Sequence, residues 1–333
     1  MSIRVIGSLY PCTLQDMGRQ GFRAFGVPLS GPMDPYSFHL ANLLCGNAAG
    51  GVALEITLHG LVLLFEEDML IALCGGGSVP VIEGEPVACF RPLLMRRGTL
   101  LAFRPSSEGC RMYLAVAGGF QADRIMGSAA TYLPAAIGGF GGRALKKGDL
   151  LMRAEPPGTL SSRMLAGLEV IPRAGGPASW GSNPFPWLLD SDALLRFLPG
   201  PEWSDFSASS RLQFETDLFH LTDKSDRMGC QLKGPVLTHQ LTGEMLSTGV
   251  CPGTVQVTHA GVPIILMADG QTTGGYPRIA QVISADLPVC GQRRPGSSIR
   301  FRQVSMSEAH ELHRLRMRSL MQVGQSIQLR YGL

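Results

Sequence analysis

The segment PIILMADGQTTGGYPRIAQVISA, residues 263–285, indicates the kind of fold that this chain adopts. Its first part, PIILMA (263–268), is a short unbroken apolar run, which is typical of a fully buried strand. A polar stretch, DGQTTGGYPRIAQ (269–281), follows, and a second apolar run, VISA (282–285), ends the segment. The adjacent glycines and the proline of the polar stretch favour turns over helix. We therefore expect two strands joined by a long polar loop.

The same pattern of short apolar runs between turn residues recurs along the chain. With 42 glycines and 23 prolines among 333 residues, the composition favours many turns and short elements. Three segments also share basic residues, a glycine and then an apolar strand: 95–103, 145–152 and 293–301. They hint at repeated hairpin units. We expect a mainly β protein with a few short helices. The other strand-like runs are IRVIG (3–7), ALEITLHGLVLLF (53–65), LIALCG (70–75), TLLAF (99–103), RMYLAVAGG (111–119) and TVQVTHA (254–260).

The length of the chain and one weakly patterned region predict two domains. A chain of 333 residues fits two domains of ordinary size. Residues 155–190 are rich in proline, glycine and serine, as linkers and long surface loops are. We therefore place an N-terminal domain at 1–190, which includes this linker, and a C-terminal domain at 191–333.

Two segments carry helix signals. In DPYSFHLANLLCG (34–46), Asp34 can cap the helix, Pro35 suits the first helical position and Gly46 ends it. In SMSEAHELHRLRMRSLMQV (305–323), Ser305 and Glu308 match a capping box. Three arginines on this second helix are expected to be solvated, with a partner-binding role as the alternative: Arg314, Arg316 and Arg318.

Composition argues against several classes of function. Lys+Arg 29 against Asp+Glu 26 gives a net charge of +3, which is too small to suggest nucleic acid or an acidic membrane as a partner. No apolar run is long enough to span a bilayer, and the first residues do not resemble a signal peptide. The eight cysteines include no C-x-x-C pair and are expected to be reduced. We expect a cytoplasmic protein without a metal site, since His310 and His313 lack the further ligands of a zinc motif.

Common catalytic signatures are absent from the sequence. There is no G-x-S-x-G nucleophile elbow and no G-x-x-x-x-G-K-[ST] phosphate loop. The glycine-rich stretch GGFGGRALKKGD (138–149) carries Arg143, Lys146 and Lys147, so its backbone could cradle a phosphate or a carboxylate. A tight loop between strands is the alternative, and it is the interpretation that we favour.

Three polar, glycine-containing loops are better candidates for a site: 13–37, 224–234 and 269–281. The first precedes the N-terminus of a helix, where anions bind readily. An acid beside a glycine often only caps a turn, so each loop also has a structural interpretation. Together the loops suggest a binding canyon. Their polar residues are Gln15, Asp16, Arg19, Ser30, Asp34, Asp226, Arg227, Asp269, Gln271, Thr272, Tyr276 and Arg278.

Several long motifs, in the order in which they occur along the chain, resemble those of the family known as allophanate hydrolase subunit 2, also called KipA-like or biotin-dependent carboxyltransferase. The resemblance runs from about residue 3 to residue 312. The motifs are TLQDMGRQGFRAFGVPLSGPMD (13–34), ALEITLHG (53–60), MYLAVAGGF (112–120), GSAATYLPAAIGGFGGRALKKGD (127–149), SDRMG (225–229) and ADGQTTGGYPRIAQVISADLP (268–288).

The resemblance implies a fold and a function. It implies two cyclophilin-like β-barrel domains, and a KipI-like partner subunit. With a third, LamB/YcsF-like subunit, such pairs form a 5-oxoprolinase that uses ATP, with Mg, to open pyroglutamate to glutamate. One alternative is a carboxyltransferase-type subunit that acts with carboxybiotin on urea or a related small amide. The other is a non-catalytic KipA-type regulator that binds a KipI-like kinase inhibitor.

Within this resemblance, we assign roles to the polar loops, whose ligand would be a small carboxylated or ureido molecule. Arg278 stands where several relatives have lysine, and GGGSVP (75–80) lacks an acid that many relatives have. The expected catalytic residues are Asp226, Arg227, Asp269 and Arg278. The expected substrate-binding residues are Gln15, Asp16, Ser30, Asp34, Gln271, Thr272, Gly274, Gly275 and Tyr276.

Overall fold

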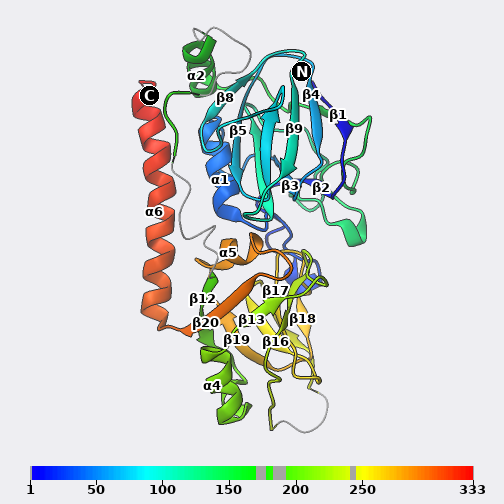
Figure 1. Ribbon diagram of the computed structural model, residues 1–333, viewed down its shortest axis with the longest axis vertical. Helices are drawn as coiled ribbons and strands as arrows, with labels where there is room; N and C mark the ends of the chain where they lie inside the picture. Colours follow the sequence, from blue (N-terminus) through cyan, green and yellow to red (C-terminus); the bar gives the residue numbers. More distant parts are fainter. Residues whose placement is uncertain (1, 170–177, 183–192, 241–244, 333) are drawn as a thin grey trace. The chain divides into compact units, whose positions relative to one another are not determined.

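The computed structural model describes residues 2–169, 178–182, 193–240 and 245–332, and its described part is mainly β, as predicted (Figure 1). Its strands are short and separated by turns, in agreement with the glycine-rich and proline-rich composition. Of the helices in these ranges, none combines the length and the apolar character needed to cross a membrane.

The chain forms two compact units. The first unit comprises Met1–Gly18, Asp34–Phe185 and Arg318–Leu333, and the second comprises Arg19–Met33 and Pro186–Met317. This division departs from a single cut at residue 190 in two places, because residues 19–33 join the second unit and the end of the last helix joins the first. The loop at 19–33 belongs to the second unit because it bonds to that unit's backbone and buries Met33 in its core.

Antiparallel strands of the first unit form two sheets around one hydrophobic core. The six-stranded sheet has the order β11 (Leu150–Met152), β1 (Ser2–Gly7), β4 (Val62–Phe65), β9 (Leu100–Pro105), β6 (Ser78–Ile82) and β7 (Glu85–Pro86). The five-stranded sheet has the order β2 (Cys12–Gln15), β3 (Ala53–Thr57), β10 (Arg111–Val116), β5 (Met69–Gly75) and β8 (Pro92–Met95). A short 3-10 helix, η2, spans Leu133–Ala135.

The central strand of the five-stranded sheet, β10, and its neighbour β5 are buried along their whole length. One face of this sheet contributes to the shared core, and α1 (Pro35–Leu44) packs on β5 and β10 (Figure 1). Burial on both faces explains why LIALCG (70–75) and MYLAV (112–116) are continuous apolar runs rather than alternating ones.

In the second unit, seven strands close into a barrel. Around the barrel they run β12 (Ala193–Pro199), β19 (Arg278–Val282), β16 (Thr254–Val257), β17 (Pro263–Leu266), β14 (Gly229–Lys233), β13 (Phe219–Leu221) and β20 (Ser298–Gln303). The parallel pairing of β12 with β20 closes the ring. The short strands β15 (Thr248–Gly249) and β18 (Thr273–Gly274) pair outside it, and η1 (Arg23–Phe25) and η3 (Trp203–Asp205) are single 3-10 turns.

A cluster of aromatic rings fills the barrel core. Phe214 of α4 (Ala208–Thr216) stacks on Phe301 with ring centroids 4.2 Å apart, and Phe197 and Phe219 meet these rings edge-on or tilted. Rings in these arrangements add attraction beyond the burial of their apolar area. These ring contacts therefore stabilise the barrel that carries the rim loops.

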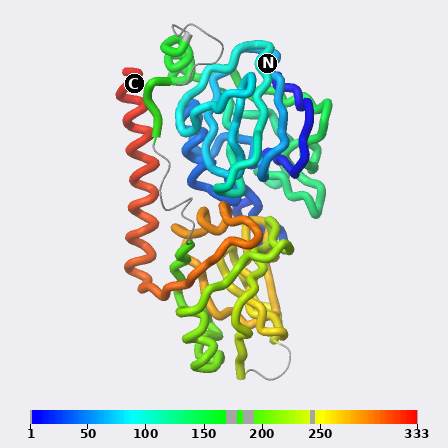
Figure 2. The backbone as a smooth tube through the Cα atoms, in the orientation of Figure 1, coloured from blue at the N-terminus to red at the C-terminus, as the bar shows by residue number. Residues whose placement is uncertain are grey.

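Both predicted helices are present, and a third lies in the predicted linker. Asp34 caps α1 by accepting a hydrogen bond from the Ser37 amide (3.0 Å), as expected. Ser305 caps α6 (Met306–Arg330) through the Glu308 amide (3.1 Å), but the Glu308 carboxylate bonds to Arg302, so the capping box is only half formed. Figure 2 shows α6 as one unbroken helical run.

The linker prediction was wrong in one part, because α2 (Thr159–Glu169) is a helix packed on β8. Residues 170–177 and 183–190 of the predicted linker lie outside the described residues. A further short helix, α5, spans Leu287–Gly291.

Arg316 of α6 is not a solvated surface residue, contrary to the prediction. Its Nη2 donates to Oδ1 of the buried Asp286 (3.0 Å), which also accepts from the Arg196 side chain (2.6 and 2.8 Å). Two arginines therefore share one buried carboxylate within the second unit. This three-residue cluster ties the first part of α6 to the barrel.

Candidate functional site

The polar stretch after Leu266 connects two barrel strands that are separated by β16. The backbone leaves β17, forms β18 beside β15, and re-enters the barrel as β19. This explains why so much polar chain lies between two apolar runs: it has to pass one strand at the barrel rim. The stretch carries most of the second-unit residues that the sequence marked as a site.

Asp269, the first residue of the stretch, forms a buried ion pair with Arg227. Arg227 donates to both carboxylate oxygens, with Nε–Oδ2 at 2.8 Å and Nη2–Oδ1 at 3.1 Å. The side chains of Asp269 and Arg227 are only 3% and 13% exposed, respectively. The Asp269 amide also donates to the Arg227 carbonyl (2.9 Å). Fork-like pairing of this kind fixes geometry as well as charge, so the two predicted catalytic residues act as one unit.

The loop containing Ser30 lies against this pair. Arg227 Nη2 donates to the Gly31 carbonyl (2.6 Å), and the Ser30 amide donates to the carbonyl of Ala268 (2.9 Å), the residue before Asp269. Ser30 has φ 57°, which is uncommon for a residue with a side chain. Its hydroxyl is buried and has no hydrogen-bond partner among the described residues. A strained residue with an unused hydroxyl beside a buried ion pair is typical of a functional site.

Arg278 is likewise paired, with Glu202 of the turn before η3. Two side-chain bonds, Nε–Oε2 at 2.8 Å and Nη2–Oε1 at 2.6 Å, are joined by a bond from the Arg278 amide at 2.9 Å. Burial raises the pKa of Glu202, but the hydrogen bonds from Arg278 outweigh it and hold that pKa below its ordinary value of 4.5. The same bonds raise the pKa of Arg278. Arg278 is therefore a fixed positive charge in this arrangement.

The remaining polar residues of the stretch bond within the protein. Gln256 of β16 accepts from Gln271 (3.2 Å) and donates to the Tyr276 carbonyl (3.2 Å). A Cβ on Gly274 would lie 2.5 Å from the side-chain nitrogen Nε2 of Gln256, so this glycine allows the close approach of the Gln256 side chain. A Cβ on Gly275 would likewise lie 3.0 Å from the Met245 carbonyl.

Asp226 has the geometry of a turn-capping residue. It is exposed, and its carboxylate accepts from the amides of Met228 (2.7 Å) and Gly229 (3.2 Å). Such bonds hold a tight turn without a catalytic role. The structural interpretation, which the sequence left open, therefore fits Asp226 best. The Tyr276 ring meets His259 edge-on, with centroids 5.4 Å apart.

A cavity of about 610 Å³ lies beside β18 in the second unit. Thr272 and Thr273 line it from the polar stretch, and Arg23 lines it from the loop at 19–33. The volume falls within the range of small-molecule sites, roughly 300–1,000 Å³. The other lining residues are Ala24, Gly26, Gly249, Val250 and Cys251.

The other predicted substrate-binding residues, Gln15, Asp16 and Asp34, belong to the first unit, and each has partners there. Gln15 Nε2 donates to Thr13 Oγ1 (2.9 Å), and Asp16 accepts from the Ala129 amide (2.6 Å). Asp34 caps α1, and its own amide donates to the Tyr113 hydroxyl (2.8 Å), which donates in turn to Glu55 (2.7 Å). These bonds stabilise the first unit.

Several interacting residues were missed by the sequence reasoning. Glu202 and Gln256 are partners of predicted residues, but a single polar side chain in an apolar strand or a proline-rich turn gives no spacing signal. Glu55 did carry a signal, because it is an acid in the alternating strand ALEIT. Arg23 lies in a loop that the sequence marked as a candidate, although the residue itself was not selected.

The glycine-rich stretch 138–149 does not fit a polyphosphate. Arg143 is paired with Asp149 through two bonds of 2.7 Å, and the Gly141 amide donates to the Asp123 carboxylate (3.1 Å). Carboxylates thus accept hydrogen bonds from the donors that would bind a phosphate, which agrees with the favoured interpretation of a tight loop. Across the described ranges, no cluster of His, Cys, Asp and Glu has the arrangement of a metal site.

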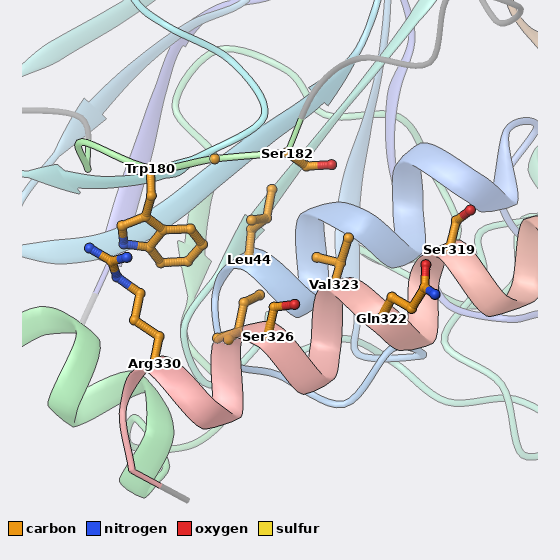
Figure 3. A pocket seen from close by; sticks show the side chains of 10 residues that line it. Leu44, Trp180, Ser182, Ser319, Gln322, Val323, Ser326 and Arg330 are labelled. Carbon is orange, nitrogen blue, oxygen red and sulfur yellow. The ribbon is translucent and has the colours of Figure 1, made fainter.

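A second cavity, of about 480 Å³, lies in the first unit between α1, residues 180–182 and the last turns of α6. The side chains of Trp180 and Arg330 lie together at one end, and Ser319 and Gln322 at the other (Figure 3). The Arg330 guanidinium covers the Trp180 ring at 5.4 Å. None of the described residues around this cavity is an acid, which makes it a poorer candidate for catalysis.

Comparison with known families assigns the chain. The model of the family described as "Carboxyltransferase domain, subdomain A and B" matches residues 25–303. The chain belongs to this carboxyltransferase domain family. The match covers the loops at 224–234 and 269–281, which meet at the Arg227–Asp269 pair. It also covers most of the described first unit.

Named relatives resemble the chain over most of its length. It is 39% identical over 307 residues to a 5-oxoprolinase subunit of Escherichia coli K12, covering 92% of this chain and 93% of that protein. It is 35% identical over 316 residues to urea amidolyase of Lachancea kluyveri, covering 90% of this chain but 17% of that protein. Among solved structures, Kluyveromyces lactis urea carboxylase matches with a TM-score of 0.85 and 29% identity, over 97% of this chain and 29% of that one.

Proposed function

We propose that this chain is a subunit of an ATP-dependent 5-oxoprolinase, which opens pyroglutamate to glutamate. The observation that carries the proposal is the 39% identity to the Escherichia coli 5-oxoprolinase subunit, which extends over more than nine-tenths of both chains. Urea amidolyase matches only over about a sixth of its own length. The proposed partners are a KipI-like subunit and a LamB/YcsF-like subunit.

The chemistry requires activation of a poor electrophile. A lactam carbonyl resists attack by water, and ATP, with Mg, supplies the activation when it phosphorylates the carbonyl oxygen. We assign the ATP site to the assembled enzyme, since the glycine-rich stretch of this chain does not fit a polyphosphate. The residues of the second unit would bind and orient the small acidic substrate.

The geometry refines the roles of the predicted residues. Both oxygens of Asp269 are bonded to Arg227, so Asp269 is a positioning residue for this guanidinium rather than a general base. Arg227, held in place, would stabilise negative charge that develops as the ring opens. The unused hydroxyl of Ser30 would hydrogen-bond the substrate. Asp226 is left out of the site because its carboxylate caps a turn.

The test is turnover by the assembled enzyme. The chain would be purified together with its KipI-like and LamB/YcsF-like partners, and glutamate release and ATP hydrolysis would be measured on 5-oxoproline. We expect substrate-dependent turnover that falls about 10²–10³-fold in Arg227→Gln, as when one stabilising donor is removed from a transition state. Arg300→Gln, which changes an exposed arginine on β20, serves as the matched control.

One observation favours a second candidate, carboxyl transfer from carboxybiotin. The family model is that of a carboxyltransferase domain, and the TM-score to urea carboxylase is 0.85. Incubation with isotopically labelled carboxybiotin and urea would distinguish the candidates. Label transfer to urea, with no release of glutamate from 5-oxoproline by the complete assembly, would replace the oxoprolinase proposal with this one.

A further inference from the structure

Arg23 differs from the arginines of the polar stretch in its electrostatic surroundings. Arg227 and Arg278 each face a carboxylate, whereas Arg23 forms no ion pair with any described residue. Its Nη2 donates a hydrogen bond to the Val250 carbonyl, which orients the guanidinium without neutralising it. Arg23 is half-buried and lines the cavity beside β18. It is thus a positive charge, directed by a backbone contact, in the wall of a space of about 610 Å³.

Neutral, small and hydrogen-bonding groups make up the rest of the cavity wall. The described lining residues include no carboxylate, and Ala24, Gly26 and Gly249 leave space next to the guanidinium. Thr272 and Thr273 bring two hydroxyls, and Cys251 brings a thiol. A guanidinium with nearby hydroxyl donors suits a carboxylate, to which arginine can donate two parallel hydrogen bonds.

We propose that this cavity binds the carboxylate of a small acidic ligand through Arg23, and that Arg23 rather than Arg227 or Arg278 is the cation that receives it. The inference rests on the proposed function in one respect, since it takes 5-oxoproline as the ligand. Its product, glutamate, carries the same kind of carboxylate and is the second ligand to test. Arg227 and Arg278 have their charge balanced by Asp269 and Glu202 and keep structural and electrostatic roles.

Cys251 provides a reporter within the cavity. All eight cysteines are in the described part of the chain, and Cys251 is the only exposed one. Burial raises the pKa of Cys89, the partly exposed one, to about 12, so that its thiol reacts slowly. Alkylation by iodoacetamide, followed peptide by peptide with mass spectrometry, therefore reports on Cys251, with Cys89 as the internal reference. A ligand in the cavity should slow the alkylation of Cys251 alone.

Two variants test the cavity by different means. Arg23→Gln removes the charge but keeps a donor for the Val250 carbonyl, so the loop should retain its fold. Gly249→Leu adds volume: a Cβ there meets no atom within 4 Å, and Gly249 does not need a positive φ. Both variants should abolish protection of Cys251 by 5-oxoproline, and Arg23→Lys should restore part of it. In Arg300→Gln, 5-oxoproline should protect Cys251 from alkylation as it does in the wild type.

In the assembled enzyme, Arg23→Gln should raise the KM for 5-oxoproline at least about tenfold, since it removes hydrogen bonds to a charged group, with a smaller change in kcat. Protection of Cys251 that persists in Arg23→Gln, or a KM for 5-oxoproline that this variant leaves unchanged, would overturn the inference. Turnover of 5-oxoproline by the assembly would still support the proposed function in that case. If the assembly does not turn over 5-oxoproline, and glutamate protects Cys251 only when Arg23 is present, the carboxylate site stands and the proposed function fails. Absence of protection by both ligands, in the chain and in the assembly, overturns the inference.

Discussion

Replacing Asp269 by alanine leaves the Arg227 guanidinium in the barrel without its counter-charge. The ion pair has two hydrogen bonds, of 2.8 and 3.1 Å, and its side chains are almost entirely shielded from water. Two unit charges about 4 Å apart attract by about 4 kcal/mol at an effective dielectric constant of about 20. Breaking a buried pair by removing one partner costs about 3–5 kcal/mol, in agreement with this value.

A double-mutant cycle isolates the contribution of the pair. Asp269→Ala and Arg227→Met should each destabilise the barrel by about 3–5 kcal/mol, because each leaves one buried charge without its partner. The double variant leaves no unpaired charge, so its cost should be smaller than the sum of the two by at least about 2 kcal/mol. The remaining hydrogen bond between Arg227 and the Gly31 carbonyl reduces the cost of Asp269→Ala towards the lower end of the range.

Native-state hydrogen exchange on peptides covering β14 and β17 measures the free energy of unfolding of the barrel, independently of the first unit. These two strands pair directly with each other, next to Arg227 and Asp269. Single-variant costs below about 1 kcal/mol, the range of solvent-exposed ion pairs, would refute the reasoning. Costs that add within about 0.5 kcal/mol would refute it as well, since residues without contact behave in that way.

Three further predictions concern other contacts of the second unit. The pKa of Glu202 is depressed by its bonds with Arg278. This carboxylate therefore stabilises the fold above its ordinary pKa of 4.5, and the stabilisation is lost as the pH falls through the lower pKa of the folded state. Glu202→Gln should flatten the acid limb of a plot of unfolding free energy against pH. Asp286→Ala should cost about 3–5 kcal/mol, because it leaves two arginines without their shared carboxylate, and hydrogen exchange should accelerate in residues 306–317. Gly200→Ala should be severely destabilising in thermal unfolding, since its Cβ would lie 2.0 Å from the Arg278 carbonyl oxygen.

Each of these predictions has an outcome that contradicts it. An unchanged acid limb in Glu202→Gln would show that the hydrogen bonds from Arg278 do not depress the pKa of the carboxyl. Unaltered exchange at 306–317 in Asp286→Ala would show that the arginine cluster does not hold this part of α6. A wild-type melting temperature for Gly200→Ala would contradict the close approach of the two backbones, and Gly98→Ala, where a Cβ meets open space but φ is positive, separates clash from backbone strain.

The fold class could be predicted because apolar runs and turn residues are local signals. LIALCG and RMYLAV became the buried strands β5 and β10, and Asp34 and Pro35 marked the start of α1. The assignment of residues 19–33 could not be predicted, since Met33 enters the barrel core through contacts that are distant in sequence. The helix α2 was missed because its serine-rich and glycine-containing sequence resembles a loop.

The sequence selected residues for a candidate site, and that selection stays a prediction; it did not indicate how those residues pair. Sequence motifs selected Arg227, Asp269 and Arg278, yet nothing local indicated that Asp269 neutralises Arg227 or that Glu202 neutralises Arg278. Pairing of this kind depends on strand register and loop path, which are set by the whole barrel. The position of Arg23 in the cavity wall depends on the loop path as well, so it could not be predicted from the sequence.

The most direct test of the account is the turnover of 5-oxoproline by this chain assembled with its KipI-like and LamB/YcsF-like partners. We expect ATP-dependent release of glutamate that falls about 10²–10³-fold in Arg227→Gln and is retained in Arg300→Gln, with both variants folded. The complete, folded assembly releasing no glutamate from 5-oxoproline in the presence of ATP and Mg would contradict the account.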